Sequence, residues 1–211
     1  HRFIVEIYND ILPADKFIFY LRQDQIFLKD FCRILNVAKR KSDNNVSLVK
    51  FFDSLLYSIV NFEMKMQEQI IADSLNVLPA SLPSSSSGNY YFLPSRTTLE
   101  YTYYLKQVSS NGTIYEIVSA MTPCPWTYIE IAEKLSKSHR VQHNKIYKKW
   151  VQFYSSDESC RQVEELKRVL CLLANEEASD KDKEEMKNHF ANACKYEFLF
   201  WDMAYDLSIS R

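Results

Sequence analysis

The chain has 211 residues, of which 46% are apolar and 25% are charged, and its formal net charge is −1. This size and composition suit one or at most two ordinary cores. Acidic and basic residues nearly balance and no basic stripe is visible, so we expect neither a nucleic acid nor an anionic membrane as the main partner. No apolar run is long enough to span a bilayer, and the first residues lack a signal-peptide pattern.

The five cysteines are odd in number and widely scattered, which is not the spacing of a disulfide framework, and no CxxC zinc pair occurs. A reducing compartment is the natural interpretation, so we expect a cytoplasmic protein. Most of the cysteines should be small buried or surface residues of helices, namely Cys32, Cys160, Cys171 and Cys194.

Turn-forming residues are scarce. The only glycines are Gly88 and Gly112, and the six prolines are confined to a few places. Sheets joined by tight hairpins usually need more turn residues, whereas long helices do not. The composition therefore predicts an all-α fold.

The first long helix should begin near Pro13, a residue tolerated in a first helical turn. A second should run from about 46 to 75. Their apolar stripes are Phe17, Leu21, Leu28, Phe31 and Leu35 in the first, and Leu48, Phe51, Phe52, Leu55, Ile59, Phe62 and Met66 in the second. The serine-rich stretch 79–94 reads as a surface loop.

After this loop, Ser95 or Thr97 can cap a helix that ends at Asn111-Gly112. A further helix leads to Met121, where a Thr-Pro-Cys-Pro sequence interrupts it, and another continues through Leu135. A segment at 143–154 and a helix around 163–173 follow. The last helix should begin near Ser179. No internal repeat is visible, and residues 1–211 fit a single helical-bundle domain.

Two carboxylates fall on apolar stripes, Asp24 in the first long helix and Glu197 in the last. A buried carboxylate is costly unless it is paired, hydrogen-bonded or protonated. One interpretation is a contact between helices through a buried hydrogen bond. The other is a polar pocket at the centre of the bundle, where facing helices commonly build ligand sites, and two such residues on separate helices favour it.

Cys124 lies between Pro123 and Pro125, at a predicted helix start. It is either a small residue at a helix break or a reactive thiol, because free amides and the helix dipole can lower a thiol's pKa. Tyr128 lies one turn later and should face the same way. An aromatic pocket with two acids and a thiol suits a flat, cationic or protonatable heterocycle.

The histidines argue against two other classes of site. His139 and His143 lie in a basic connector, and His189 lies on a helix face rich in Lys and Glu. A Cys–His pair is therefore not expected. Di-iron bundles need inward Glu-x-x-His pairs, and Glu63 has no ligand partner one turn away, so we expect no metal site.

Four blocks of sequence resemble the TenA / thiaminase II family and occur in its order. They are Leu12-Pro13 through Tyr20-Leu21-Arg22-Gln23-Asp24 with Phe27-Leu28; Glu100-Tyr101-Thr102 followed by Ala120-Met121-Thr122-Pro123-Cys124-Pro125-Trp126-Thr127-Tyr128; Tyr147 through Trp150-Val151 to Tyr154; and Tyr196-Glu197 through Phe200-Trp201 to Ala204. The resemblance covers almost the whole chain. It implies a haem-oxygenase-like helical bundle, commonly a homotetramer.

The resemblance also implies roles for individual residues. Cys124 corresponds to a nucleophile that adds to a pyrimidine ring, and Glu197 to the acid that exchanges a proton with a ring nitrogen. Asp24 corresponds to the carboxylate that holds the amidine-like edge of the ring. The remaining positions correspond to aromatic walls and hydroxyls of the pocket: Phe27, Tyr101 and Phe200, and Tyr128 and Tyr154.

The implied activity is hydrolysis of an aminopyrimidine, either the aminomethyl compound or thiamine, to hydroxymethyl-pyrimidine in thiamine salvage. Covalent cysteine catalysis of this kind needs neither metal nor cofactor. The alternatives are a non-catalytic pyrimidine-binding or transcription-regulatory protein and a metal-dependent oxidase on the same bundle. Family members have more helix before the segment at His1, which suggests a truncated amino terminus, and the serine-rich loop is longer than in the family.

Overall fold

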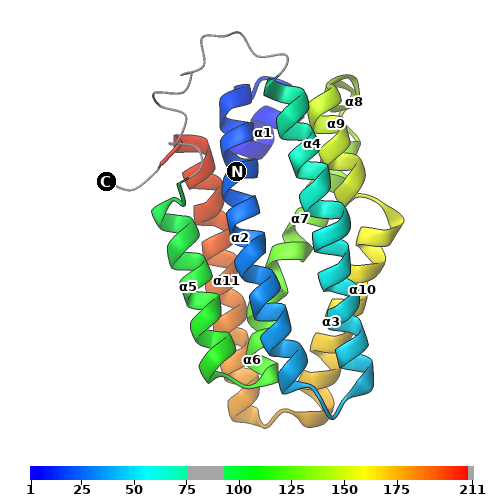
Figure 1. Ribbon diagram of the computed structural model, residues 1–211, viewed down its shortest axis with the longest axis vertical. Helices are drawn as coiled ribbons and strands as arrows, with labels where there is room; N and C mark the ends of the chain where they lie inside the picture. The colour runs from blue at the N-terminus through cyan, green and yellow to red at the C-terminus, as the bar shows by residue number, and fades with distance from the viewer. Residues whose placement is uncertain (76–92, 209–211) are drawn as a thin grey trace.

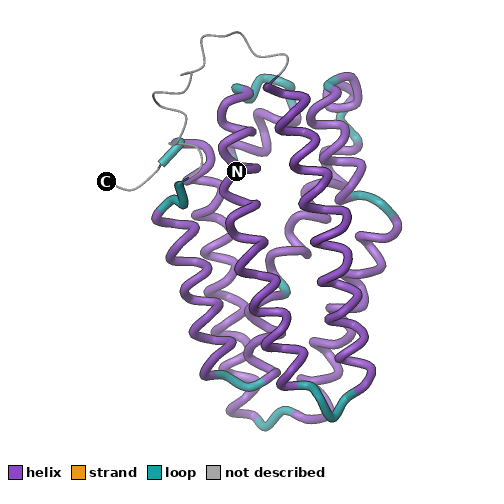
Figure 2. Tube along the Cα trace, viewed as in Figure 1, coloured by secondary structure: helices purple, strands orange, loops and turns teal. Residues whose placement is uncertain are grey.

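The computed structural model of the protein describes residues 1–75 and 93–208, and in these ranges helices are joined by short connections (Figure 2). Residues 76–92, which hold most of the predicted loop 79–94, lie outside the described residues. The α-helices are α1 (Arg2–Tyr8), α2 (Ala14–Lys41), α3 (Val46–Ser58), α4 (Met64–Leu75), α5 (Arg96–Asn111), α6 (Ile114–Met121), α7 (Pro123–Ser136), α8 (His139–His143), α9 (Lys145–Tyr154), α10 (Asp157–Leu172) and α11 (Asp180–Asp206). Two π-helical segments continue α3 and α10, at Ile59–Glu63 and Leu173–Glu177.

The long helices run along the long axis of an elongated bundle (Figure 1). Helix α2 lies at the centre and contacts α3, α4, α5 and α11, while α11 also packs against α6 and α7. Helix α7 packs against α9. No helix of the described ranges is long and apolar enough to cross a membrane.

The predicted helix boundaries agree with the caps. Helix α2 follows Pro13, as expected, and carries Asp15 in its first turn and three basic residues in its last, which suits the helix dipole. Ser95 caps α5 by accepting a hydrogen bond from the Thr98 amide. Ser179 and Asp182 form a capping box at the start of α11.

The second long helix departs from its predicted register. Phe62 was expected to be buried but is 53% exposed, and Met66 is only half-buried. Gln67 is completely buried instead, and Glu63 lines an internal cavity. The cause is the π-helical segment Ile59–Glu63, because a π-turn contains one more residue than an α-turn and so moves the inward face on by about one residue.

Gln23 fastens the start of α5 to the middle of α2. Its amide nitrogen donates to the Leu93 carbonyl at 2.8 Å, and its oxygen accepts from the Ser95 amide and the Thr98 hydroxyl, both at 2.8 Å. The side chain is completely buried, so these hydrogen bonds join segments on either side of residues 76–92 in a place that excludes water.

We expect Gln23→Ala to lower the free energy of unfolding by about 2–4 kcal/mol, because it leaves buried polar groups without a partner. The measurement is urea denaturation followed by circular dichroism. Gln25→Ala is the matched control, since Gln25 is also a buried glutamine of α2 but has no side-chain hydrogen bond to the described residues. Equal losses in the two variants would show that the hydrogen bonds of Gln23 add little.

Candidate active site

An internal cavity of about 70 Å³ lies between α2, the π-helical end of α3, α7, α9 and α10. Its wall combines polar and apolar side chains: Asp24, Leu28, Phe31, Leu55, Ser58, Ile59, Glu63, Met121, Cys124, Pro125, Tyr128, Ile129, Phe153, Tyr154, Ser159, Gln162, Val163 and Leu166. Among the described residues, no Lys, Arg or His lines it. The cavity therefore presents carboxyl, hydroxyl and thiol groups without a compensating cation.

Cys124 reaches this cavity from the junction of α6 and α7. Pro123 and Pro125 have no amide hydrogen, so the helical hydrogen bonds that they would donate are missing. The interruption is a single turn residue, Thr122, whose backbone is still α-helical and whose carbonyl accepts from the Trp126 amide at 3.3 Å. Helix α6 thus runs almost directly into α7.

Of the two interpretations of Cys124, the structure does not supply the lowered pKa on which the reactive thiol was argued. Burial raises the pKa of its thiol well above the usual value, and the negative charges of Glu197 and Asp24 raise it further. In addition, α6 runs almost directly into α7, so Cys124 has no separate helix end whose free amides and dipole would favour a thiolate. At rest the group is a thiol.

Glu197, on α11, is only 5% exposed and accepts a hydrogen bond of 2.7 Å from the Tyr101 hydroxyl of α5. Burial raises its pKa to about 7, and hydrogen bonds from Tyr101 and the Cys124 thiol partly offset that rise. Glu197 does not line the cavity itself. It lies behind Cys124, where a carboxylate can accept the thiol proton.

Asp24, on α2, is 3% exposed and lines the cavity. Its Oδ2 accepts a hydrogen bond of 2.6 Å from the side-chain nitrogen of Gln67 on α4. Burial and then the charge of Glu63 raise the pKa of Asp24 well above its usual range. The Oε1 atom of Gln67 is buried without a hydrogen-bond partner among the described residues.

Sequence reasoning considered Glu63 only as a metal ligand, and it missed both Glu63 and Gln67 as residues of this site. Glu63 accepts a hydrogen bond of 2.6 Å from the Tyr154 hydroxyl, and burial raises the pKa of Glu63 to about 7. Gln67 is also 3.4 Å from that hydroxyl. Their spacing of one helical turn was a usable signal. It was overlooked because the expected α-helical stripe passed through Phe62 and Met66.

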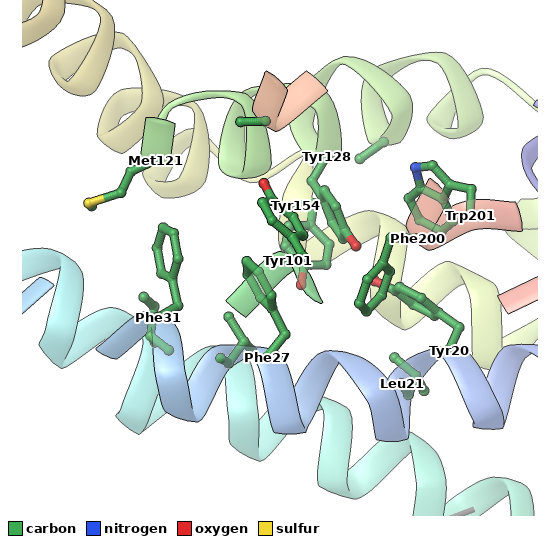
Figure 3. Packing of buried hydrophobic residues seen from close by; sticks show 14 of the residues in the cluster. Tyr20, Leu21, Phe27, Phe31, Tyr101, Met121, Tyr128, Tyr154, Phe200 and Trp201 are labelled. Atoms are coloured by element: carbon green, nitrogen blue, oxygen red, sulfur yellow. The ribbon is translucent and has the colours of Figure 1, made fainter. Parts of the chain in front are cut away.

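The predicted aromatic residues divide between two places. Tyr128 and Tyr154 line the cavity, with ring centroids 5.2 Å apart. Phe27, Tyr101 and Phe200 do not line it but pack beside it, with Phe27 4.9 Å from Tyr101 and 6.0 Å from Phe200. Figure 3 shows these rings between the helices. The structure therefore gathers every predicted site residue around one centre, in two adjoining layers.

The other cysteines do not line the cavity, although Cys32 lies near Glu63 and Cys194 near Glu197. Cys32, Cys160 and Cys194 are half-buried, Cys171 is exposed, and none forms a disulfide in the described ranges. Helix positions at the edges of apolar stripes explain the partial burial, since such positions are only partly covered by neighbouring helices. No group of His, Cys, Asp and Glu side chains among the described residues is arranged to hold a metal ion.

The fold and the site define an all-α protein with an internal cavity in whose wall a thiol lies near buried carboxyl groups. Comparison with known proteins identifies the group to which it belongs. Residues 1–207 match the TENA/THI-4/PQQC family, and the chain belongs to that family.

Individual relatives support this assignment. The chain is 31% identical to an aminopyrimidine aminohydrolase of Halalkalibacterium halodurans, over 98% of the chain and 88% of that protein. It is 29% identical to one of Helicobacter pylori, over 97% and 90%. The structure resembles a TenA homologue from P. horikoshii OT3 with a TM-score of 0.81 at 25% identity, over 98% and 90% of the two chains. The predicted haem-oxygenase-like helical fold is confirmed.

Proposed function

We propose that this protein hydrolyses an aminopyrimidine, 4-amino-5-aminomethyl-2-methylpyrimidine and/or thiamine, to hydroxymethyl-pyrimidine in thiamine salvage. The observation that carries the proposal is the placement of the Cys124 thiol in a cavity wall with the Glu197 carboxyl behind it. The aminopyrimidine aminohydrolases at 29–31% identity over nearly the full chain support the same reaction.

In this reaction the pyrimidine ring lies in the cavity between Cys124 and Asp24. Asp24 binds the amidine-like edge of the ring, and the Gln67 amide holds the Asp24 carboxyl in place through their 2.6 Å hydrogen bond. Tyr128 and Tyr154 form the adjoining polar wall. Phe27, Tyr101 and Phe200 support the site from behind, and the Tyr101 hydroxyl orients Glu197.

The chemistry begins from a thiol rather than a thiolate, because burial and the nearby carboxylates raise the pKa of Cys124. Glu197 accepts the thiol proton as sulfur bonds to a ring carbon, and passes it to a ring nitrogen. The electron pair of that nitrogen then expels the group on the exocyclic methylene carbon. Water adds to this carbon and gives one proton to the departing group or to solvent. The carbon–sulfur bond then breaks, the proton on the ring nitrogen returns to sulfur through Glu197, and the ring regains its aromaticity.

The direct test is steady-state hydrolysis of the aminomethyl-pyrimidine beside thiamine, with ammonia and hydroxymethyl-pyrimidine as measured products. We expect stoichiometric release of both from the aminomethyl compound. Tight pyrimidine binding without turnover would contradict the hydrolase and favour a binding or regulatory protein.

We also propose that the protein is cytoplasmic and forms a homotetramer. The odd, scattered and unpaired cysteines support a reducing compartment, the cytoplasm. Apolar side chains exposed on the outer faces of α5 and α11, among them Leu99, Tyr103 and Phe198, support association into the homotetramer that the family resemblance implies. Light scattering coupled to gel filtration would measure the mass of the assembly.

A further inference from the structure

Glu63 is a third carboxyl group of the site, and the proposed steps give it no role. It lines the same cavity as Asp24 and Cys124 but comes from the π-helical end of α3, whereas Cys124 comes from α7. A π-turn is less stable than an α-turn and is frequent at functional sites. The chain thus departs from regular helix where it brings this carboxyl to the cavity.

The contacts of Glu63 leave part of it available to a ligand. The Tyr154 hydroxyl donates to Oε1 at 2.6 Å, while Oε2 accepts no hydrogen bond from another described residue. The side chain is half-buried, so it is neither sealed in the core nor free on the surface. A carboxylate held by one oxygen can bind a donor with the other.

The charges around the cavity define the kind of ligand. Asp24 and Glu63 line it, Glu197 lies behind Cys124, and no Lys, Arg or His of the described residues faces them from the wall. Like charges in a buried site disfavour one another, and a cation placed among them removes that penalty. A neutral ligand would leave the carboxyl groups uncompensated.

We propose that Glu63 binds the leaving amino group of the substrate as a primary ammonium and so makes the site selective for aminomethyl-pyrimidines over thiamine. The inference rests on the proposed function and deepens it. A primary ammonium offers N–H donors to Glu63, whereas the quaternary thiazolium nitrogen of thiamine has none.

The test is calorimetric binding in a Cys124→Ser background, where turnover does not consume the ligand. The probes are the aminomethyl-pyrimidine, the hydroxymethyl-pyrimidine and thiamine, at about pH 8, where aliphatic amines are protonated. Glu63→Gln keeps the shape of the side chain and an oxygen for the Tyr154 hydroxyl. Glu68→Gln, at an exposed position of α4, is the matched control.

We expect Glu63→Gln to weaken binding of the aminomethyl compound by about ten- to a hundredfold, the range of a lost charge-assisted hydrogen bond. Binding of the neutral hydroxymethyl compound should change by less than about threefold. Thiamine, whose cationic nitrogen has no N–H donor, should lose less affinity than the amine, and Glu68→Gln should change none of the three. An equal loss for all three ligands, or no loss for the amine, would overturn the assignment.

The outcomes separate this inference from the proposed function. If the native chain binds the amine through Glu63 but releases no ammonia, the hydrolase is wrong and the ammonium site stands. If it hydrolyses the amine and Glu63→Gln leaves the ratio of affinities unchanged, the hydrolase stands and the ammonium site is wrong. Glu63→Asp, which keeps the charge, should retain more of the preference for the amine than Glu63→Gln, and thermal melting confirms that each variant is folded.

Discussion

Cys124→Ser is expected to lower kcat/KM for the aminomethyl-pyrimidine by about 10⁴-fold or more, the scale of losing a covalent nucleophile. A serine hydroxyl in the same place is a far weaker nucleophile, and Glu197 cannot make it equivalent to a thiol. Cys124 is half-buried in the cavity wall, so the change of one atom should leave the bundle folded. Ammonia release over a range of substrate concentrations measures the effect.

Cys171→Ser is the matched control for this experiment, because Cys171 is exposed on α10 and lies outside the cavity wall. It should hydrolyse the substrate at the native rate. Unchanged turnover by Cys124→Ser, with a native melting temperature, would exclude the covalent mechanism. The pocket would then have to activate water directly.

Glu197→Gln is expected to lower kcat/KM by about 10²- to 10⁴-fold, the usual contribution of general acid–base catalysis. The amide can still accept the hydrogen bond from Tyr101, so the loss reports proton transfer rather than misfolding. Glu184→Gln, at an exposed position on the same helix, is the control and should be neutral. A loss of less than about threefold in Glu197→Gln would remove this residue from the mechanism.

The pH dependence of the native enzyme follows from the protonation of Glu197 and Cys124. The pKa of Glu197 is raised to about 7 and that of Cys124 lies well above its usual value. In the reactive form, Cys124 and Glu197 together carry one proton. Below about pH 7 both are protonated, so kcat/KM should rise as pH increases through 7. Glu197→Gln should lose this rise in kcat/KM. The pKa of Glu63 is also about 7, so Glu63→Gln measures how much Glu63 contributes to the rise.

Much of the fold and half of the polar site follow from local sequence patterns. Asp24 and Glu197 were detectable because a carboxylate on an apolar stripe conflicts with its surroundings, and Ser95 and Ser179 were detectable as caps. These signals depend only on residues within a few turns of one another.

The features that were missed depend on tertiary packing or on a change of helical period. The pKa of Cys124 is raised by burial and then by carboxylates from other helices, neither of which a local pattern reveals. The sequence around Gln23 does not reveal its role, because its hydrogen-bond partners lie 70 or more residues away along the chain. The regular helical period places Phe62 and Met66 inward in place of Glu63 and Gln67, because the π-helical segment changes the register after Ile59.

The π-helical segment also affects how relatives should be aligned. It absorbs one inserted residue between Ile59 and Glu63 without disturbing the inward faces of α3 and α4. A relative with one residue fewer there can present the same glutamate and glutamine from an uninterrupted α-helix, so a single gap at this point preserves the site. A relative of equal length without the π-turn would instead direct the residue that corresponds to Phe62 toward the cavity. The equivalent of Glu63 is therefore found by counting back one turn from the buried glutamine, and not forward from Ile59.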